Sequence, residues 1–218
     1  MSAEFFTFRL GAGELLSLPD AGVRVWGLGS EPLRLAAGST YWALITGGPV
    51  RCALGEERFT LGGACYVVAS EAGLLEGGSG MVIQLEGYRG LRQLGGPLES
   101  TGRLRYVDGC SDTLLVCPPR LGEPCLNHLH LPAGTDQSFH THDTLRLGVI
   151  ARGAGECRTA AGSTPLTAGL GWWIPAGLRH AFRTAQSPLD VFAWHPDSDF
   201  GPTDGDHPMI NRTLLSGS

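Results

Sequence analysis

Glycine is the residue that most restricts what this chain can fold into, because it recurs at short intervals along the whole sequence. The chain has 33 Gly and 14 Pro among its 218 residues, and Gly is therefore about twice as frequent as in an average protein. Both residues interrupt regular structure, which excludes long helices, coiled coils and helical bundles. No Gly-X-Y period occurs, and 42% of the residues are hydrophobic, which excludes collagen and a disordered chain. Many short strands joined by turns are the structure that fits.

Charge and hydropathy exclude further classes of protein. Every basic residue is Arg, so Schiff-base, pyridoxal-lysine and P-loop lysine chemistry is excluded. The net charge is -5 and is shared almost evenly by the two halves, so we expect no nucleic-acid partner. No apolar run approaches the ~18 residues of a membrane span, and the N-terminus lacks the apolar segment of a signal peptide. We therefore expect a cytoplasmic protein with no membrane partner.

Two series of short apolar segments follow one another along the chain. The first lies between residues 33 and 88, and a break rich in Gly at residues 95–102 separates it from the second. Short segments bounded by Gly-containing turns indicate antiparallel β-structure. We therefore predict an all-β chain of two successive units, residues 1–97 and 103–196, followed by a Pro- and Asp-rich tail at residues 197–218.

Histidine is confined to the second series. All seven His lie between His128 and His207. The order of turns and apolar segments is nevertheless similar in both halves, beginning with Ala36-Ala37-Gly38 in the first and Pro132-Ala133-Gly134 in the second. We interpret this as a duplicated barrel whose first copy carries no histidine, and we expect any chemistry in the second copy.

Three of the histidines are placed where they can share one ligand. Residues 138–151 are predicted to form a strand, and because side chains alternate along a strand, His140, His142 and Arg146 share one face. His180 opens a later strand after a turn, and a barrel can bring it to the same place. Three imidazoles with open coordination positions suit Fe, Zn, Ni, Cu or Mn.

The spacing of these residues resembles the two sequence motifs of the cupin superfamily. The first motif matches Gly134, His140, His142, Arg146 and Gly153, and the second matches Gly169, Pro175, Gly177, His180 and Thr184. The resemblance implies a bicupin, two tandem cupin-type double-stranded β-helix (jelly-roll) barrels, with a divalent metal held by His140, His142 and His180. It covers residues 120–196 well and residues 30–90 only as a copy without ligands.

Two residues depart from the cupin pattern. Arg146 stands where the first motif has Glu, and Thr184 stands where the second has Asn. A guanidinium offers only donors and cannot ligate a metal, and Asp143 lies on the opposite face of the predicted strand. The site is therefore at best a three-histidine site, which resembles that of thiol dioxygenases. That resemblance implies Fe(II) as the favoured metal and Arg146 as the group that orients an anionic substrate through a bidentate pair.

Each of these residues also has a structural interpretation. The three histidines are either a metal site or a fossil of one, and Arg146 either anchors substrate or forms a structural ion pair. His128 and His130 share one face of the preceding strand. They either line the cavity or are core or rim histidines whose ring nitrogens are hydrogen-bonded within the protein. Phe182 and Trp172, or Trp173, either wall a pocket or pack in the core. His195 and His207 belong to the tail, which we expect to cover the barrel mouth or a partner subunit.

Two classes of function follow from this interpretation. The first is a metal-dependent enzyme of small-molecule metabolism, an iron-dependent dioxygenase, with a lyase or isomerase as a variant. The second is a non-catalytic cupin that binds a small ligand, with a structural metal or none. We also predict a homodimer, because Leu145, Leu147 and Val149 on the face away from the metal need cover, which the first half of the chain is equally able to supply.

Overall fold

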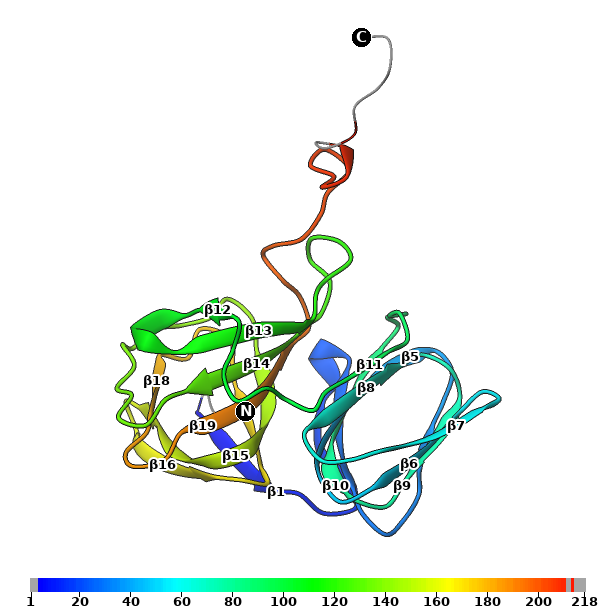
Figure 1. The fold of residues 1–218 in the computed structure, drawn as a ribbon, viewed down its shortest axis with the longest axis horizontal. Helices are drawn as coiled ribbons and strands as arrows, with labels where there is room; N and C mark the ends of the chain where they lie inside the picture. Colours follow the sequence, from blue (N-terminus) through cyan, green and yellow to red (C-terminus); the bar gives the residue numbers. More distant parts are fainter. Residues whose placement is uncertain (1–3, 211–212, 214–218) are drawn as a thin grey trace.

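The computed structural model describes residues 4–210 and 213, and its regular structure is almost entirely antiparallel strand, as predicted. Two β bodies lie side by side (Figure 1). The helical elements of the described residues are two short 3-10 helices, η1 (Pro19–Ala21) and η2 (Val107–Gly109). No helix in residues 4–210 is long and apolar enough to span a membrane.

The first body consists of two antiparallel sheets that enclose a hydrophobic core. One sheet has the order β11-β8-β5-β10-β3-β2, and the other has the order β4-β9-β6-β7. Tyr41, Ala43 and Ile45 of the first sheet meet Val50 and Leu54 of the second in this core. The strands are β2 (Gly13–Leu18), β3 (Val23–Leu28), β4 (Leu33–Leu35), β5 (Ser39–Gly47), β6 (Val50–Leu54), β7 (Glu57–Leu61), β8 (Cys65–Ala69), β9 (Gly73–Glu76), β10 (Ser79–Glu86) and β11 (Gln93–Gly95).

The second body contains the histidines and is organised around one long strand, β15 (Arg146–Thr159). The first part of β15 pairs with β17 and β19, and its second part pairs with β16 and β18. The sheet has the order β1-β17-β15-β19-β14-β13-β12. Its strands are β1 (Phe6–Arg9), β12 (Leu104–Arg105), β13 (Ser111–Val116), β14 (Cys125–Leu131), β15, β16 (Gly162–Thr167), β17 (Leu170–Ile174), β18 (His180–Arg183) and β19 (Leu189–His195).

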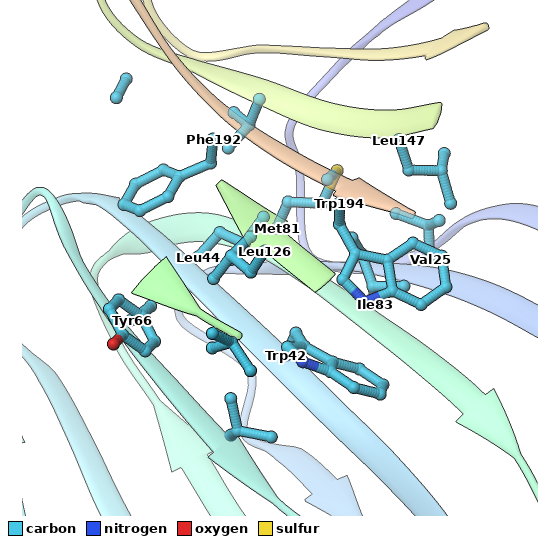
Figure 2. Close-up of a cluster of buried hydrophobic side chains, with 14 of the residues drawn as sticks. Val25, Trp42, Leu44, Tyr66, Met81, Ile83, Leu126, Leu147, Phe192 and Trp194 are labelled. Carbon is cyan, nitrogen blue, oxygen red and sulfur yellow. The ribbon is translucent and has the colours of Figure 1, made fainter. Parts of the chain in front are cut away.

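A second hydrophobic cluster joins the two bodies, and we call it the seam. Trp42 of β5 and Trp194 of β19 meet in it with ring centroids 5.4 Å apart. Figure 2 shows the two tryptophans among apolar side chains from both bodies. These include Val25, Leu44, Met81 and Ile83 of the first body and Leu126, Leu147 and Phe192 of the second. Each large apolar side chain buried in this way contributes about 1.5–3 kcal/mol.

The seam changes the argument for a homodimer. Leu147 and Val149 are fully buried in it, and Leu145 packs against it. The face that we expected to need a partner subunit is thus covered by the first half of the same chain. The homodimer itself stays a prediction, but this face no longer supports it.

The first strand of the chain departs from the simple order of two successive units. β1 pairs with β17, with Phe6 opposite Trp173, and so extends the sheet that holds the histidines. β2 is the first strand that pairs within the first body. The predicted boundary between residues 97 and 103 stays a prediction, and the pairing of β1 crosses it.

Candidate metal centre

His140 and His142 lie in a loop, and the prediction that residues 138–151 form one strand is wrong for its first part. β15 begins only at Arg146. His140 is held instead by an isolated bridge, in which its backbone and that of His180 exchange two N–H···O bonds of 3.0 Å. The backbone N–H of Gly177 donates to the carbonyl oxygen of His142 at 2.8 Å. Gly177 has φ of 72°, which a residue without Cβ adopts without strain. Tertiary contacts, not strand alternation, therefore bring the two imidazoles to one side.

The three imidazoles converge on one point. The ring centroids of His140, His142 and His180 are 4.6–5.1 Å apart, and one ring nitrogen from each lies within 4.8 Å of the others. Nδ1 of His140 lies 2.9 Å from the carbonyl oxygen of Ser138, and Nδ1 of His180 lies 2.8 Å from that of Leu178. A carbonyl oxygen only accepts, so each Nδ1 donates, and in a neutral ring this leaves the lone pair on Nε2.

The protonation of these rings fits a metal. Nε2 of His180 is buried without a hydrogen-bond partner. Burial, and then the charge of Arg146, lowers the pKa of His142 to about 3, and burial lowers the pKa of His180 to about 4. Both rings are therefore neutral at pH 7, which is the form that binds a metal ion. The backbone acceptors on Nδ1 orient His140 and His180 as such acceptors do in metal sites.

A cavity of about 320 Å³ opens beside the three histidines. Its walls are about equally polar and apolar, and Trp172 and Phe182, two residues predicted to line a pocket, belong to the apolar part. Leu129, Ile174 and Ala193 complete the apolar wall. The volume is at the small end of the range for ligand-binding cavities in proteins. The ligand that fits here is therefore a small molecule.

Arg146 places a positive charge in the wall of this cavity, where the carboxylates of Asp197 and Asp199 act on it electrostatically. Its Nη1 donates to Thr144 Oγ1 at 2.6 Å and to the carbonyl oxygens of Thr144 and Leu145. No carboxylate of the described residues lies within ion-pair distance of the guanidinium, so the structural ion pair considered above is absent from this part of the chain. Burial lowers the pKa of Arg146, but from so high an ordinary value that the group stays charged at neutral pH.

Comparison with known proteins agrees with this architecture. The sequence profile of the AraC-like ligand binding domain matches residues 130–200, a range that includes all three histidines. The fold is similar to that of a Cupin 2 conserved barrel domain protein from Leptotrichia buccalis, with a TM-score of 0.60 and 14% identity, over 90% of this chain and 91% of that one. The chain therefore has the cupin fold.

Two other solved structures are similar in fold. Salicylate 1,2-dioxygenase from Pseudaminobacter salicylatoxidans has a TM-score of 0.60 and 12% identity, over 80% of this chain and 70% of that chain. The putative glyoxylate induced protein from Pseudomonas aeruginosa has a TM-score of 0.61 and 12% identity, over 84% of this chain and 83% of that chain. At these identities the likeness shows the fold alone. No curated protein matches this chain by sequence.

His128 and His130 lie away from the cavity. They alternate along β14 with Asn127 and Leu129, which do line it. His128 Nε2 and His130 Nδ1 lie 2.8 and 2.9 Å from the same carboxylate oxygen of Asp190. Both rings are buried. They are thus placed as satisfied core histidines, the second of the two interpretations above.

Several cavity residues were missed from the sequence. Asp112 on β13 and Asn127 on β14 line the cavity, and so does Tyr106, which follows β12. His195 was assigned to the tail, but it is the buried last residue of β19, lines the cavity, and has its pKa lowered to about 4, chiefly by burial. The alternation of β14 was the available signal for Asn127, since it shares a face with Leu129. The tail itself reaches the cavity, because Asp199 and Phe200 form part of its wall, while His207 is exposed.

Proposed function

We propose that this protein is a metal-dependent enzyme of small-molecule metabolism, an Fe(II) dioxygenase-type oxidoreductase that acts on small anionic substrates. The observation that carries the proposal is the convergence of His140, His142 and His180 beside a cavity that contains the unpaired Arg146. The fold likeness to salicylate 1,2-dioxygenase supports it. Zn, Ni, Mn and Cu also bind imidazole ligands, so the three histidines do not select the metal by themselves. Iron is favoured because the proposed reaction is that of a dioxygenase.

The residues of the site have three roles in the proposed function: binding the metal, binding the substrate and excluding water. His140, His142 and His180 would hold the metal, which, when bound, supplies open coordination positions and a redox-active centre. Arg146 binds the anionic group of the substrate and fixes its orientation. Trp172 and Phe182 exclude water from the apolar part of the cavity. With these water-excluding walls, the charge of Arg146 acts more strongly than in bulk solvent.

A non-catalytic role in ligand binding is the second candidate. The match to the AraC-like ligand binding domain favours it, because residues 130–200 contain the whole histidine site. In this case the cavity binds the same class of small anion, and the metal is structural or absent. A lyase or isomerase reaction at the same metal site is a variant of the first proposal.

Metal analysis followed by oxygen consumption separates these candidates. The protein is purified without added metal, its metal content is measured, and O2 uptake is recorded over a panel of small acids and thiols. The enzyme proposal predicts a bound transition metal and substrate-dependent O2 uptake, both lost in His140→Ala. If no transition metal copurifies, and if His140→Ala leaves metal content and ligand binding unchanged, the enzyme proposal is wrong. A bound small acid without O2 uptake would favour the binding role.

A further inference from the structure

A fourth histidine, His195, lies in the cavity wall but is not one of the three converging ligands. It is the last residue of β19, and side chains alternate between the two faces of a strand. Phe192 and Trp194 of β19 pack in the seam, whereas Ala193 and His195 line the cavity. The imidazole of His195 therefore points from β19 into the cavity.

One ring nitrogen of His195 is held by the tail, and the other is open. Nδ1 donates a hydrogen bond to the backbone carbonyl oxygen of Asp197, since a carbonyl oxygen only accepts. Within residues 4–210, Nε2 of His195 has no hydrogen-bond partner. It is also not among the fully buried atoms of these residues that lack a partner, which include Nε2 of His180. Nε2 of His195 is thus accessible from the cavity that its ring lines.

This open nitrogen is a hydrogen-bond acceptor. Burial, and then the charge of Arg146, lowers the pKa of His195 to about 4, so the ring is neutral at pH 7. With the one proton of the neutral ring on Nδ1, the lone pair is on Nε2. A ligand that displaces water from this nitrogen without offering a donor leaves it unpaired, which weakens binding.

Arg146 supplies a second open polar group in the same cavity. All three hydrogen bonds that its guanidinium donates leave from Nη1. Nε and Nη2 donate none within residues 4–210, and neither is a fully buried atom without a partner. Asn127, by contrast, is occupied at both ends of its amide, by Asp112 and Cys125. The wall therefore offers an open donor edge on Arg146 and an open acceptor on His195.

We propose that His195 is a specificity-determining residue whose Nε2 accepts a hydrogen bond from a hydroxyl group of the ligand, while Arg146 binds the anionic group of the same ligand. The ligand class is thus the small hydroxy acids. A hydroxyl suits this position better than an ammonium group, because the charge of Arg146 repels a second cation. The inference rests on the part of the proposed function that assigns a small anionic ligand to the cavity, and it does not depend on which reaction follows.

Calorimetric titration with matched acids tests this inference. The probes are benzoate and butyrate, each compared with its monohydroxy derivatives, with the hydroxyl at each position. The protein is loaded with Zn(II), which binds imidazole ligands and has no redox chemistry. We expect at least one hydroxy acid to bind the wild type about five- to tenfold more tightly than its parent acid, as expected for one hydrogen bond.

Two amide variants separate the two nitrogens of His195. His195→Gln places an amide where Nε2 was, so it should keep most of the preference for the hydroxy acid. His195→Asn places an amide only where Nδ1 was, so it can still donate to Asp197 but should lose the preference. Zn(II) content should equal that of the wild type in both, so a contribution of the metal to hydroxyl binding is the same in all three proteins. His207→Asn, at the exposed histidine of the tail, is the matched control and should keep the preference.

Four results would overturn the inference: the wild type prefers no hydroxy acid, His195→Asn keeps the preference, His195→Gln loses it, or no probe binds at millimolar concentration. If the variants do not fold, the same comparison on the metal-free wild type decides, because only groups of the protein then bind the hydroxyl. If the protein takes up no metal but the wild type and variants show the expected pattern, the inference stands and the enzyme proposal fails.

Discussion

In the proposed function, recognition of an anionic ligand depends most on Arg146. It replaces a potential metal ligand by a cation, and it lies in the cavity wall beside His142, whose pKa its charge helps to lower. Burial, together with the charge of Arg146, keeps His142 and His180 neutral, and the guanidinium does not itself compete for a metal. Among the described residues, Arg146 is the one basic group other than histidine in the cavity wall, which also contains Asp112 and Asp199.

Substitution of Arg146 separates ligand binding from metal binding. Arg146→Gln should weaken binding of a small carboxylate by about tenfold to a hundredfold, because a hydrogen bond to a charged group contributes about 1.5–3 kcal/mol. Metal content should be unchanged. Calorimetry with the best-bound acid and metal analysis measure the two effects. Arg179→Gln, which removes an exposed guanidinium stacked on Phe139, is the control; loss of metal in Arg146→Gln would contradict the assigned role.

Asp190 predicts a pH dependence of stability. Burial raises its pKa, but the hydrogen bonds from His128 and His130 and the charge of Arg152 outweigh burial and leave the pKa below its ordinary value. A carboxyl whose pKa is lower in the folded state stabilises the fold above its unfolded pKa, and this contribution is lost as the pH falls through the folded pKa. It is therefore fully present at pH 7.

We expect Asp190→Asn to lower the free energy of unfolding by about 3 kcal/mol at pH 7, as when a buried charge network loses one partner. The difference from the wild type should shrink as the pH falls below about 4, where the wild-type carboxyl also loses its charge. Urea unfolding at a series of pH values measures it. A difference that is constant between pH 7 and pH 3 would show that the charge of Asp190 does not contribute.

At the level of elements, the loop before β15 decides the geometry of the site. Asp108 in η2 has φ of 55°, unusual for a residue with a side chain. Its carboxylate accepts hydrogen bonds from the backbone N–H of Ser138 at 2.6 Å and from its hydroxyl at 3.2 Å. The carbonyl oxygen of Ser138 in turn accepts the Nδ1 proton of His140. η2 thus orients a candidate metal ligand through Ser138.

Asp108→Ala should therefore weaken metal binding by about tenfold or more, as loss of an outer partner of a metal ligand does elsewhere. Asp108→Gly relieves the backbone conformation but removes the same hydrogen bonds, so it should weaken metal binding as well while unfolding at a higher temperature than Asp108→Ala. Competition with a chelator of known affinity measures metal binding. Equal affinities in the wild type and both variants would show that the loop is held without Asp108.

The sequence predicted the elements of the second half better than it predicted the pairing of β1 or the loop that contains His140 and His142. The resemblance of the spacing of Gly134, Gly177 and the histidines to the cupin motifs predicted the barrel and the three converging imidazoles. Strand alternation correctly predicted that His140 and His142 lie on one side, but the segment that contains them is a loop, because β15 begins only at Arg146. Asp112 was missed because its neighbour across the sheet, Leu129, is fixed by the pairing of β13 with β14, which a local pattern does not show.

At the level of the whole molecule, the two bodies share one hydrophobic seam. The histidine-free first body covers the outer face of β15 and β19 with Trp42, Leu44 and Met81. Its contribution is therefore structural support for the sheet from which Arg146 projects. The sequence left open whether a partner subunit or the first half covers this face, since alternation shows that a face is apolar but not what packs against it.

Leu147→Ala tests this coupling of the two bodies. Leu147 is fully buried in the seam, so its truncation should lower the free energy of unfolding by about 2–5 kcal/mol. Leu91→Ala, at a leucine that is 64% exposed, should change it little. Denaturant unfolding followed by Trp fluorescence measures both. If Leu147→Ala is as stable as Leu91→Ala, the seam does not stabilise the molecule.

The metal stoichiometry of two histidine variants tests the central claim most directly. Within residues 4–210 there are two clusters of potential ligands, one of His140, His142 and His180 in the cavity and one of His128, His130 and Asp190 at the opposite face of β14. Fe(II) titration under anaerobic conditions should give one ion per chain for the wild type and for His130→Ala, and none for His140→Ala. Binding that survives in His140→Ala but is lost in His130→Ala would contradict the proposed metal centre.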